Sequence, residues 1–492
     1  MHSEKLFIMT KLRKILLIPA LIIVCISGFF SCGVDRWPEY AHQTALDTWM
    51  YDIMQQNYLW YQDLPSYDDI NLFLEPSSFL SKVKSSKDSY SFADSVMATP
   101  LPTYGFDYSL VRNPDNDTAY NALITYVIPG SPAASAGLER GDWIVKVDTS
   151  YISKKYESQL LQGTEPIEVT LGKYQKVTPE ETPGEDGKEE TEGGKEETED
   201  DEEEEDIYRV VITGEPVEIG AATPLTDNPV HCKKILPLTD GSKVGYLMYN
   251  SFTAGTKEDA EKYNDELREW SNELAQENIR KVILDLRYNE GGSIDCVQLL
   301  STIFVPSYYH NQTMAYLEYN DKNTDKNATL TFNTELLKSG SSLELTTLIV
   351  LISGETAGAP EMLMHCLNGK IQQLVAIGSS TKGQNVGTEQ FVNEEFLWSV
   401  NPVVCTIYNS EHDTYSGFKA TYSVNASTDY LNFLPFGNPE ETLLSVALGF
   451  LNGTYPPKEE DKDKTARSLK IEKSVNSSAS RIFIGGNGLR IK

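Results

Sequence analysis

Three short segments carry the residues whose types and spacing suit chemistry on a peptide. Residues 104–106 read Tyr-Gly-Phe, residues 285–292 end in a double glycine, and residues 353–384 contain serine, threonine, glutamate and lysine. A glycine-bearing loop can present backbone N–H groups to a terminal carboxylate, and a free strand edge beside it can accept an extended peptide. A hydroxyl beside a neutral lysine forms a nucleophile–base pair. These segments therefore indicate peptide recognition, and cleavage wherever a hydroxyl and an amine meet.

Composition argues against several other kinds of site and partner. The six histidines are scattered, and no histidine or cysteine spacing matches a zinc site, so we expect no metal and no cofactor. The net charge of −30 argues against nucleic acid, and against a bare anionic lipid surface, as the main partner. The four cysteines that follow the N-terminal segment are widely spaced, so we expect no disulfide framework. We expect them to be mostly buried and to pack as small apolar residues: Cys232, Cys296, Cys366 and Cys405.

Positioning such residues requires a rigid scaffold, and residues 216–455 predict an α/β arrangement. Short apolar runs typical of fully covered strands occur at 282–286, 348–352 and 374–377. Apolar residues recur at helical spacing over 260–274, and a further helix is expected at 359–367, between the second and third strands.

Residues 100–215 predict a small β domain. Its β-prone runs include 123–128 and 143–147, and the proline, glycine and alanine residues between them predict a short helix. Residues 176–206 contain 17 acidic residues and three lysines, a net charge of −14. We expect this insertion to be a disordered, solvated loop between two strands.

The flanking regions have different characters. Residues 36–95 predict a helical region, with an apolar face that includes Leu46, Met50, Met54 and Tyr58. Residues 456–492 are charged and then rich in serine, asparagine and glycine, so we expect a poorly ordered tail.

The N-terminus predicts export and anchoring. Lys11, Arg13 and Lys14 precede an apolar run at 15–30 that is short for a membrane span, which favours a signal peptide. The run ends in Ser31-Cys32-Gly33, which resembles a bacterial lipobox. This resemblance implies lipidation of Cys32 and a place in the bacterial cell envelope, facing the periplasm or the cell surface. An ordinary cleaved signal and an uncleaved anchor are the alternatives.

Residues 126–148 resemble a PDZ domain of the kind found in C-terminal-processing (tail-specific) serine peptidases. Gly130-Ser131-Pro132-Ala133-Ala134 and Gly137-Leu138, with Arg140-Gly141-Asp142, carry this match. The resemblance implies that Tyr104, Gly105 and Phe106 form the carboxylate-binding loop. Residues 283–292 resemble the family's most recognisable motif, an apolar strand that ends in Asp-Leu-Arg and a double glycine. Residues 244–252 and 434–439 resemble its entry strand and its late loop.

The resemblance implies a multidomain α+β protein. It contains an N-terminal helical region, a PDZ-like β domain and an α/β peptidase-like domain of the tail-specific protease type. The expected divisions are a lipoprotein signal segment (1–32), the helical region (36–95), the PDZ-like domain with its acidic insertion (100–215), the peptidase-like domain (216–455) and a C-terminal tail (456–492). The expected partners are peptide or protein C-termini, and the membrane through the lipid anchor.

The same family uses a serine nucleophile three residues before a glutamate, and a lysine base after a Gly-x-x-Thr-aromatic-Gly stretch. Alignment on Glu361 places the nucleophile position at Gly358, and alignment on residues 378–383 places the lysine position at Gln384. The oxyanion donors implied by the family are the N–H groups of Ala359 and of Gly291 or Gly292. Both members of the dyad are therefore absent from their expected positions, which predicts a pseudopeptidase that binds without hydrolysis.

Two alternatives remain open at this point. Thr356 or Ser353 can serve as a relocated nucleophile with Lys382 as base, provided that the two groups lie within about 3 Å. The fold also resembles that of a vertebrate retinoid-binding protein, which implies a small-ligand carrier if a large apolar cavity is present.

Overall fold

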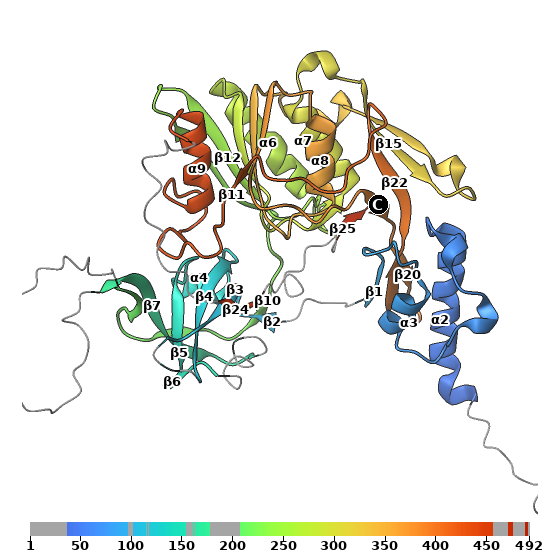
Figure 1. Cartoon of the computed structure of the whole chain (residues 1–492), viewed down its shortest axis with the longest axis horizontal. Helices are drawn as coiled ribbons and strands as arrows, with labels where there is room; N and C mark the ends of the chain where they lie inside the picture. Colours follow the sequence, from blue (N-terminus) through green and yellow to red (C-terminus); the bar gives the residue numbers. More distant parts are fainter. Residues whose placement is uncertain are drawn as a thin grey trace, which may run out of the picture.

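The computed structural model describes residues 37–96, 102–114, 116, 118–153, 160, 163–177, 207–455, 471–475 and 488–490 (Figure 1). The signal segment with Cys32, and the acidic insertion from residue 178 to 206, lie outside the described residues. Within the described ranges, every helix is too short or too polar to cross a membrane.

A central six-stranded sheet forms the core of the α/β region, in the order β11-β12-β13-β17-β18-β23. Its strands are β11 (Val230–Pro237), β12 (Lys243–Tyr249), β13 (Lys281–Asp285), β17 (Thr347–Ile352), β18 (Gln373–Gly378) and β23 (Tyr422–Ser423). All neighbours are parallel except β11 and β12. The three apolar runs expected to be covered strands are β13, β17 and β18, so their carboxyl ends share one edge of the sheet.

Different elements cover the two faces of this sheet. Alternate strand residues pack on one face against α6 (Lys262–Gln276), α7 (Ile294–Phe304) and α8 (Ala359–Leu367). The other face packs against α9 (Thr442–Leu451) and against Tyr126 of the β domain. Figure 1 shows α9 apart from the group of α6, α7 and α8. Burial on both faces explains why these strands are continuously apolar.

A second six-stranded sheet has the order β14-β25-β19-β22-β15-β16. Its strands are β14 (Gly291–Ser293), β25 (Gly488–Arg490), β19 (Val386–Thr388), β22 (Val403–Asn409), β15 (Thr313–Tyr319) and β16 (Ala328–Thr331). This sheet takes strands from both sides of the predicted helix at 359–367 and from the C-terminal tail.

The β domain has the predicted order of strand, short helix and strand. Its main sheet runs β24-β3-β4-β5-β7-β8, with β6 on β5 and β9 on β7. Its elements are β3 (Phe106–Arg112), β4 (Tyr120–Val127), α4 (Pro132–Ser135), β5 (Trp143–Val147), β6 (Ser150–Tyr151), β7 (Ile167–Val177), β8 (Ile207–Ile212), β9 (Val217–Ile219) and β24 (Ile471–Val475). Val177 lies opposite Ile207, so the acidic insertion joins the two strands of a hairpin.

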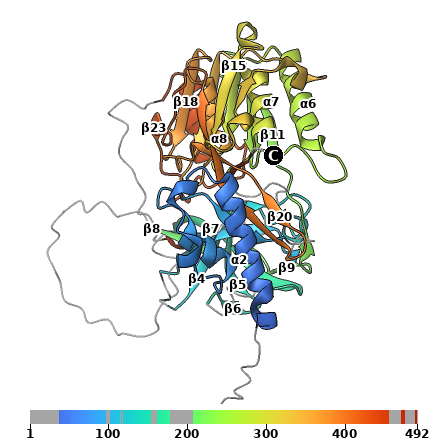
Figure 2. The same ribbon diagram turned by 90° about the vertical axis from the view of Figure 1, so that its right-hand side faces the viewer.

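The N-terminal helical region shares a sheet and a core with the peptidase-like region. It contains α2 (Trp37–Asn57), α3 (Pro76–Val83) and β1 (Phe92–Ser95), and the helix α2 runs along the front of the molecule in Figure 2. Strand β1 pairs with β21 (Trp398–Asn401), which also pairs with β20 (Phe391–Asn393). The predicted apolar face of α2 packs into the same cluster as Val400 and Val403.

Two short segments of the C-terminal tail form strands, and the rest of the tail, for which poor order was expected, lies outside the described residues. Eight of its residues form the strands β24 and β25, which pair with the β domain and with the second sheet. Sequence periodicity missed them because each strand is short and each depends on partners more than 90 residues away.

Candidate active site

A strand-to-helix turn holds the position aligned with the nucleophile. Strand β17 ends at Ile352, helix α8 begins at Ala359, and Gly358 caps the helix with φ 66° and ψ −106°. A side chain is strained in this left-handed region, as it is in the nucleophile turns of serine hydrolases. Ala359 is the first residue of the helix, so its N–H has no acceptor within the helix.

Glu361 joins the two positions that the alignment selected. Its Oε2 accepts hydrogen bonds from the N–H groups of Gly358, at 2.9 Å, and Gln384, at 2.8 Å. The two backbone nitrogens are therefore at most 5.7 Å apart. Oε1 accepts from the Thr381 hydroxyl and, at 2.7 Å, from the Gly383 N–H. One fully buried carboxylate thus fixes both positions within one site.

Gln384 supplies no base at this site. Its side chain is 2% exposed, and its Nε2 donates to the Val386 carbonyl at 3.2 Å. The backbone carbonyl of Gln384 accepts a hydrogen bond from the Tyr415 hydroxyl at 2.7 Å. A side-chain amide has no basic lone pair on nitrogen, and this one is turned toward the backbone.

The hydroxyl groups of the alternative dyad are held by the backbone. Thr356 is fully buried, and its hydroxyl donates to the Leu286 carbonyl at 2.9 Å, while the Ser353 hydroxyl donates to the Arg287 carbonyl. Each hydroxyl proton is therefore engaged by a carbonyl rather than by an amine.

The amine of the alternative dyad is also engaged. Lys382 Nζ donates to Glu290 at 3.1 Å, and its side chain is 44% exposed. Glu355 lies in the same group of charges. Burial raises its pKa to about 7, with a further increase from Glu290 that Lys382 partly offsets. The amine of Lys382 therefore faces a carboxylate rather than a hydroxyl that it could deprotonate.

Asn289 organises the double-glycine turn, and sequence reasoning gave it no role. Its Oδ1 accepts from the Gly291 N–H at 3.1 Å, its Nδ2 donates to the Tyr249 carbonyl, and its carbonyl accepts from the Ala357 N–H. The Gly291 N–H is therefore already engaged and does not serve as a free oxyanion donor. At Gly292 an added Cβ would lie 2.3 Å from the Phe252 carbonyl oxygen, so only glycine fits.

Arg287 of the Asp-Leu-Arg motif links the site to helix α9. Its guanidinium makes two hydrogen bonds with Asp285, at 2.9 and 2.8 Å, and two with Glu441, at 2.6 and 3.0 Å. Burial alone would raise the pKa of Glu441, but Arg287 and Arg140 lower it to about 2. Arg140 comes from the β domain and lies 3.5 Å from Glu441, with its guanidinium over the ring of Phe433. This network ties the β domain to the site.

The predicted carboxylate-binding loop is packed within the β domain. Tyr104 and Phe106 are buried, and Gly105 has φ 85°. The Gly105 N–H donates to the Thr103 hydroxyl at 3.1 Å, and its carbonyl accepts from the Ile128 N–H. Strand β2 (Pro102–Thr103), just before the loop, pairs with β10 (Thr223–Pro224). The loop reaches the start of β3, whose outer edge pairs with β24.

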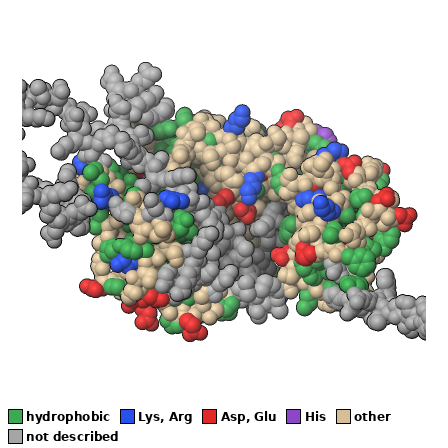
Figure 3. Space-filling model, turned by 60° about the horizontal axis from the view of Figure 1, so that its bottom comes forward, with side chains coloured by type: hydrophobic (Ala, Val, Ile, Leu, Met, Phe, Trp, Pro, Cys, Tyr) green, Lys and Arg blue, Asp and Glu red, His purple; other side chains and the backbone are tan. Residues whose placement is uncertain are grey.

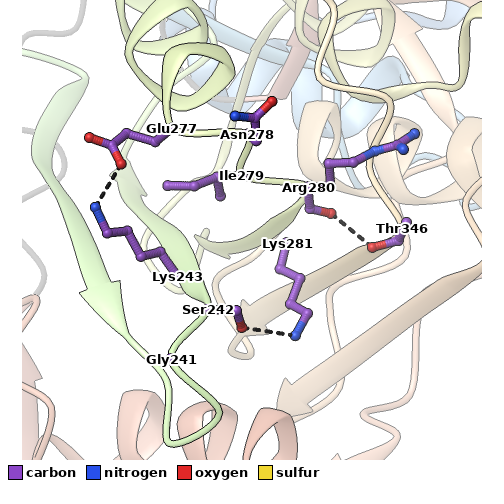
Figure 4. A pocket seen from close by; sticks show the side chains of 9 residues that line it. All are labelled: Gly241, Ser242, Lys243, Glu277, Asn278, Ile279, Arg280, Lys281 and Thr346. Carbon is purple, nitrogen blue, oxygen red and sulfur yellow. Dashed lines mark hydrogen bonds and ion pairs between the residues drawn. The ribbon is translucent and has the colours of Figure 1, made fainter.

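A separate pocket of about 340 Å³ opens at the other end of the central sheet (Figure 4). Its lining includes Lys243, Glu277, Arg280 and Lys281, and Figure 4 shows Lys243 paired with Glu277. It adjoins the amino ends of the strands, away from Gly358, and its charged lining does not suit an apolar small ligand.

The described residues contain no cluster of three or more histidine, cysteine or acidic side chains arranged to hold a metal ion. On the face shown in Figure 3, the described basic side chains are dispersed rather than gathered into one patch.

Comparison with known proteins agrees with this architecture. A family model described as Peptidase family S41 matches residues 243–399, an S41 N-terminal domain matches 45–92, and a PDZ domain matches 123–172. A solved structure of a Bacteroides fragilis protein assigned to the S41 proteases is 42% identical. The match covers 82% of this chain and 97% of that chain, with a TM-score of 0.74.

Two curated relatives are more distant. A carboxyl-terminal-processing protease of Picosynechococcus is 22% identical over 262 residues, which is 53% of this chain and 50% of the relative. A Staphylococcus aureus protein described as a CtpA-like serine protease is 25% identical over 264 residues, 54% of this chain and 42% of the relative. The chain thus spans half the length or less of these relatives. The match along nearly the whole B. fragilis structure shows that the chain belongs to peptidase family S41, with its N-terminal and PDZ domains.

Proposed function

We propose that this S41-family chain is an exported, lipid-anchored protein that binds peptide or protein C-termini without hydrolysing them. One observation carries the proposal. The positions aligned with the nucleophile and the lysine converge on Glu361, and they carry a glycine and a backbone-bound glutamine.

The chemistry of the site supports binding without cleavage. Glycine has no side-chain atom that can attack a carbonyl, and removing the nucleophile of a serine protease lowers turnover by roughly a millionfold. The hydroxyls of Thr356 and Ser353 donate to backbone carbonyls, and Lys382 pairs with Glu290. A relocated dyad would have to break the Lys382–Glu290 contact and the contact of one of the two hydroxyls before it could form.

The features that support peptide binding are separate from the missing dyad. The Ala359 N–H at the start of helix α8 suits an electronegative peptide carbonyl. Strand β3 of the PDZ domain already pairs with β24 along its outer edge, so this edge accepts an added strand and a peptide can pair there in place of β24. Binding through main-chain hydrogen bonds needs neither a nucleophile nor a base.

Back-substitution tests the catalytic part of the proposal. The variant Gly358→Ser/Gln384→Lys should hydrolyse fluorescent casein and react with a fluorophosphonate probe, whereas the parent and both single variants should do neither. The matched control is Gly354→Ser/Gln372→Lys, which adds the same side chains at a turn with an open Cβ position and at an exposed bend just before β18. Hydrolysis by the parent chain would refute the proposal. A folded double variant without activity would refute the assignment of the two positions.

Peptide capture is tested with a random peptide library that ends in free carboxylates, compared with the same library ending in carboxamides. We expect measurable binding only for the carboxylate library. Absence of binding for both libraries, or equal binding, would contradict recognition of C-termini.

The anchor is tested through Cys32, which precedes the described residues. The variant Cys32→Ala should lose incorporation of labelled palmitate and leave the membrane fraction of a bacterial host. Unchanged labelling would contradict lipidation at this residue.

A further inference from the structure

The C-terminal tail provides an additional strand at the edge of the PDZ domain. Strand β24 (Ile471–Val475) pairs antiparallel with β3 (Phe106–Arg112), with Ile471 opposite Val111 and Val475 opposite Tyr108. The other edge of β3 pairs with β4, so β24 alone covers the edge that an extended ligand would use. Figure 1 shows β24 beside β3, although 359 residues separate Ile471 from Arg112.

The direction of β24 matches that of a bound C-terminal peptide. Along β24 from Ile471 to Val475, the partner residues run backward along β3 toward the loop at 104–106. Strand addition gives affinity through main-chain hydrogen bonds, and the carboxyl end of the added strand then approaches the carboxylate-binding loop. The tail therefore lies where a ligand would lie, with the polarity that a ligand would have.

A second segment of the tail adds a strand to the second sheet, beside the aligned dyad positions. Strand β25 (Gly488–Arg490) pairs parallel with β14, with Gly488 opposite Gly291 and Leu489 opposite Gly292. On its other side, Arg490 pairs with Thr388 of β19. Strand β14 carries the double-glycine turn, and β19 begins two residues after Gln384. Strand β25 therefore lies between two strands that adjoin the candidate active site.

The charge of the tail complements the rest of the chain. Residues 456–492 contain nine lysine or arginine residues and five acidic residues, a net charge of +4. The other residues therefore carry −34. A basic segment on an acidic body gains attraction that any neutral competitor lacks.

We propose that the tail is an intramolecular ligand: residues 471–475 occupy the PDZ edge, residues 488–490 pair between β14 and β19, and an external peptide binds by displacing them. This rests on the proposed peptide-binding function, but not on the loss of hydrolysis. Covalent attachment to the same chain gives such a segment an effective concentration on the order of 1 mM. If the free segment binds with a Kd of about 100 μM, roughly one groove in ten is open, and apparent affinity for external peptide falls about tenfold.

A truncation measures this competition. The probe is a fluorescein-labelled synthetic peptide of residues 468–475 that ends in a free carboxylate at Val475. The full chain is compared with a chain that stops after Tyr455, whose ring still packs on Tyr422 at 5.3 Å. Fluorescence anisotropy should show about tenfold tighter binding to the shortened chain. Equal binding to both chains overturns the proposal, whereas a shortened chain that binds no peptide at all contradicts the peptide-binding function instead.

A cross-link in the full chain tests the pairing without any deletion. Ser109 and Ser474 are direct partners across β3 and β24, and such Cα atoms lie about 4.5–5.5 Å apart, within the span of a disulfide. The variant Ser109→Cys/Ser474→Cys should form a disulfide within one chain and lose probe binding until it is reduced.

The matched control is Ser109→Cys/Glu472→Cys, which shifts one cysteine by two residues along the same strand and should cross-link more slowly. Each single-cysteine variant should bind the probe equally with and without oxidant, since it cannot form the link. Failure of the first pair to link, or linkage only between two chains, overturns an intramolecular ligand.

Discussion

Replacing Glu361 with glutamine tests whether one carboxylate holds the site together. Each carboxylate oxygen of Glu361 accepts two hydrogen bonds. Oε2 accepts from Gly358 and Gln384, and Oε1 accepts from Thr381 and Gly383. In the better orientation, the new amide NH2 faces Thr381, whose hydroxyl can turn to accept. The Gly383 N–H then has no acceptor.

The expected cost follows from these contacts. A stranded buried donor costs about 1–3 kcal/mol, and each remaining hydrogen bond weakens by about 0.5–1 kcal/mol because its acceptor is no longer charged. The free energy of unfolding should therefore fall by roughly 3–5 kcal/mol. Urea denaturation followed by circular dichroism measures this change, and hydrogen exchange should show faster exchange of the Gly383 and Gln384 amides.

The control is Glu290→Gln, which removes a carboxylate at the solvated rim that pairs with Lys382 at 3.1 Å. Its cost should stay at or below about 1 kcal/mol. If Glu361→Gln changes the free energy of unfolding by no more than this control, and exchange near Gly383 is unaltered, the carboxylate does not organise the site.

Three further predictions concern stability. Gly358→Ala should cost about 1–3 kcal/mol because φ is 66° there, whereas Gly354→Ala should be neutral, and equal urea midpoints would contradict strain. Arg287→Ala should cost about 3–5 kcal/mol, because Asp285 and Glu441 become unpaired buried charges, and a smaller loss in urea denaturation would argue against this. Burial raises the pKa of Asp227 to about 7, above its ordinary value of 3.8. Between these two pH values the carboxyl ionises only in the unfolded state. The free energy of unfolding should therefore fall by up to roughly 4 kcal/mol as the pH rises from 4 to 7. Asp227→Asn should flatten this profile of thermal unfolding midpoint against pH, and an unchanged slope would show that other groups cause it.

Sequence alone predicted the features that depend on neighbours along the chain. The strands β13, β17 and β18 and the helix α8 follow from continuous apolar runs and turn residues, which act over a few positions. Residue identity also showed that glycine and glutamine stand at the aligned dyad positions, since no folding can supply a missing hydroxyl or amine.

Only the tertiary structure decided which of these residues meet. It brought Gly358 and Gln384 to one oxygen of Glu361, joined Arg287 to Glu441 across 154 positions, and engaged the Gly291 N–H with Asn289. The contacts between distant segments, such as Arg287 with Glu441, depend on surfaces that become complementary only once those segments pack, and local periodicity carries no trace of them. The same reason explains why no pattern in the sequence indicated that the tail would add strands to two distant sheets.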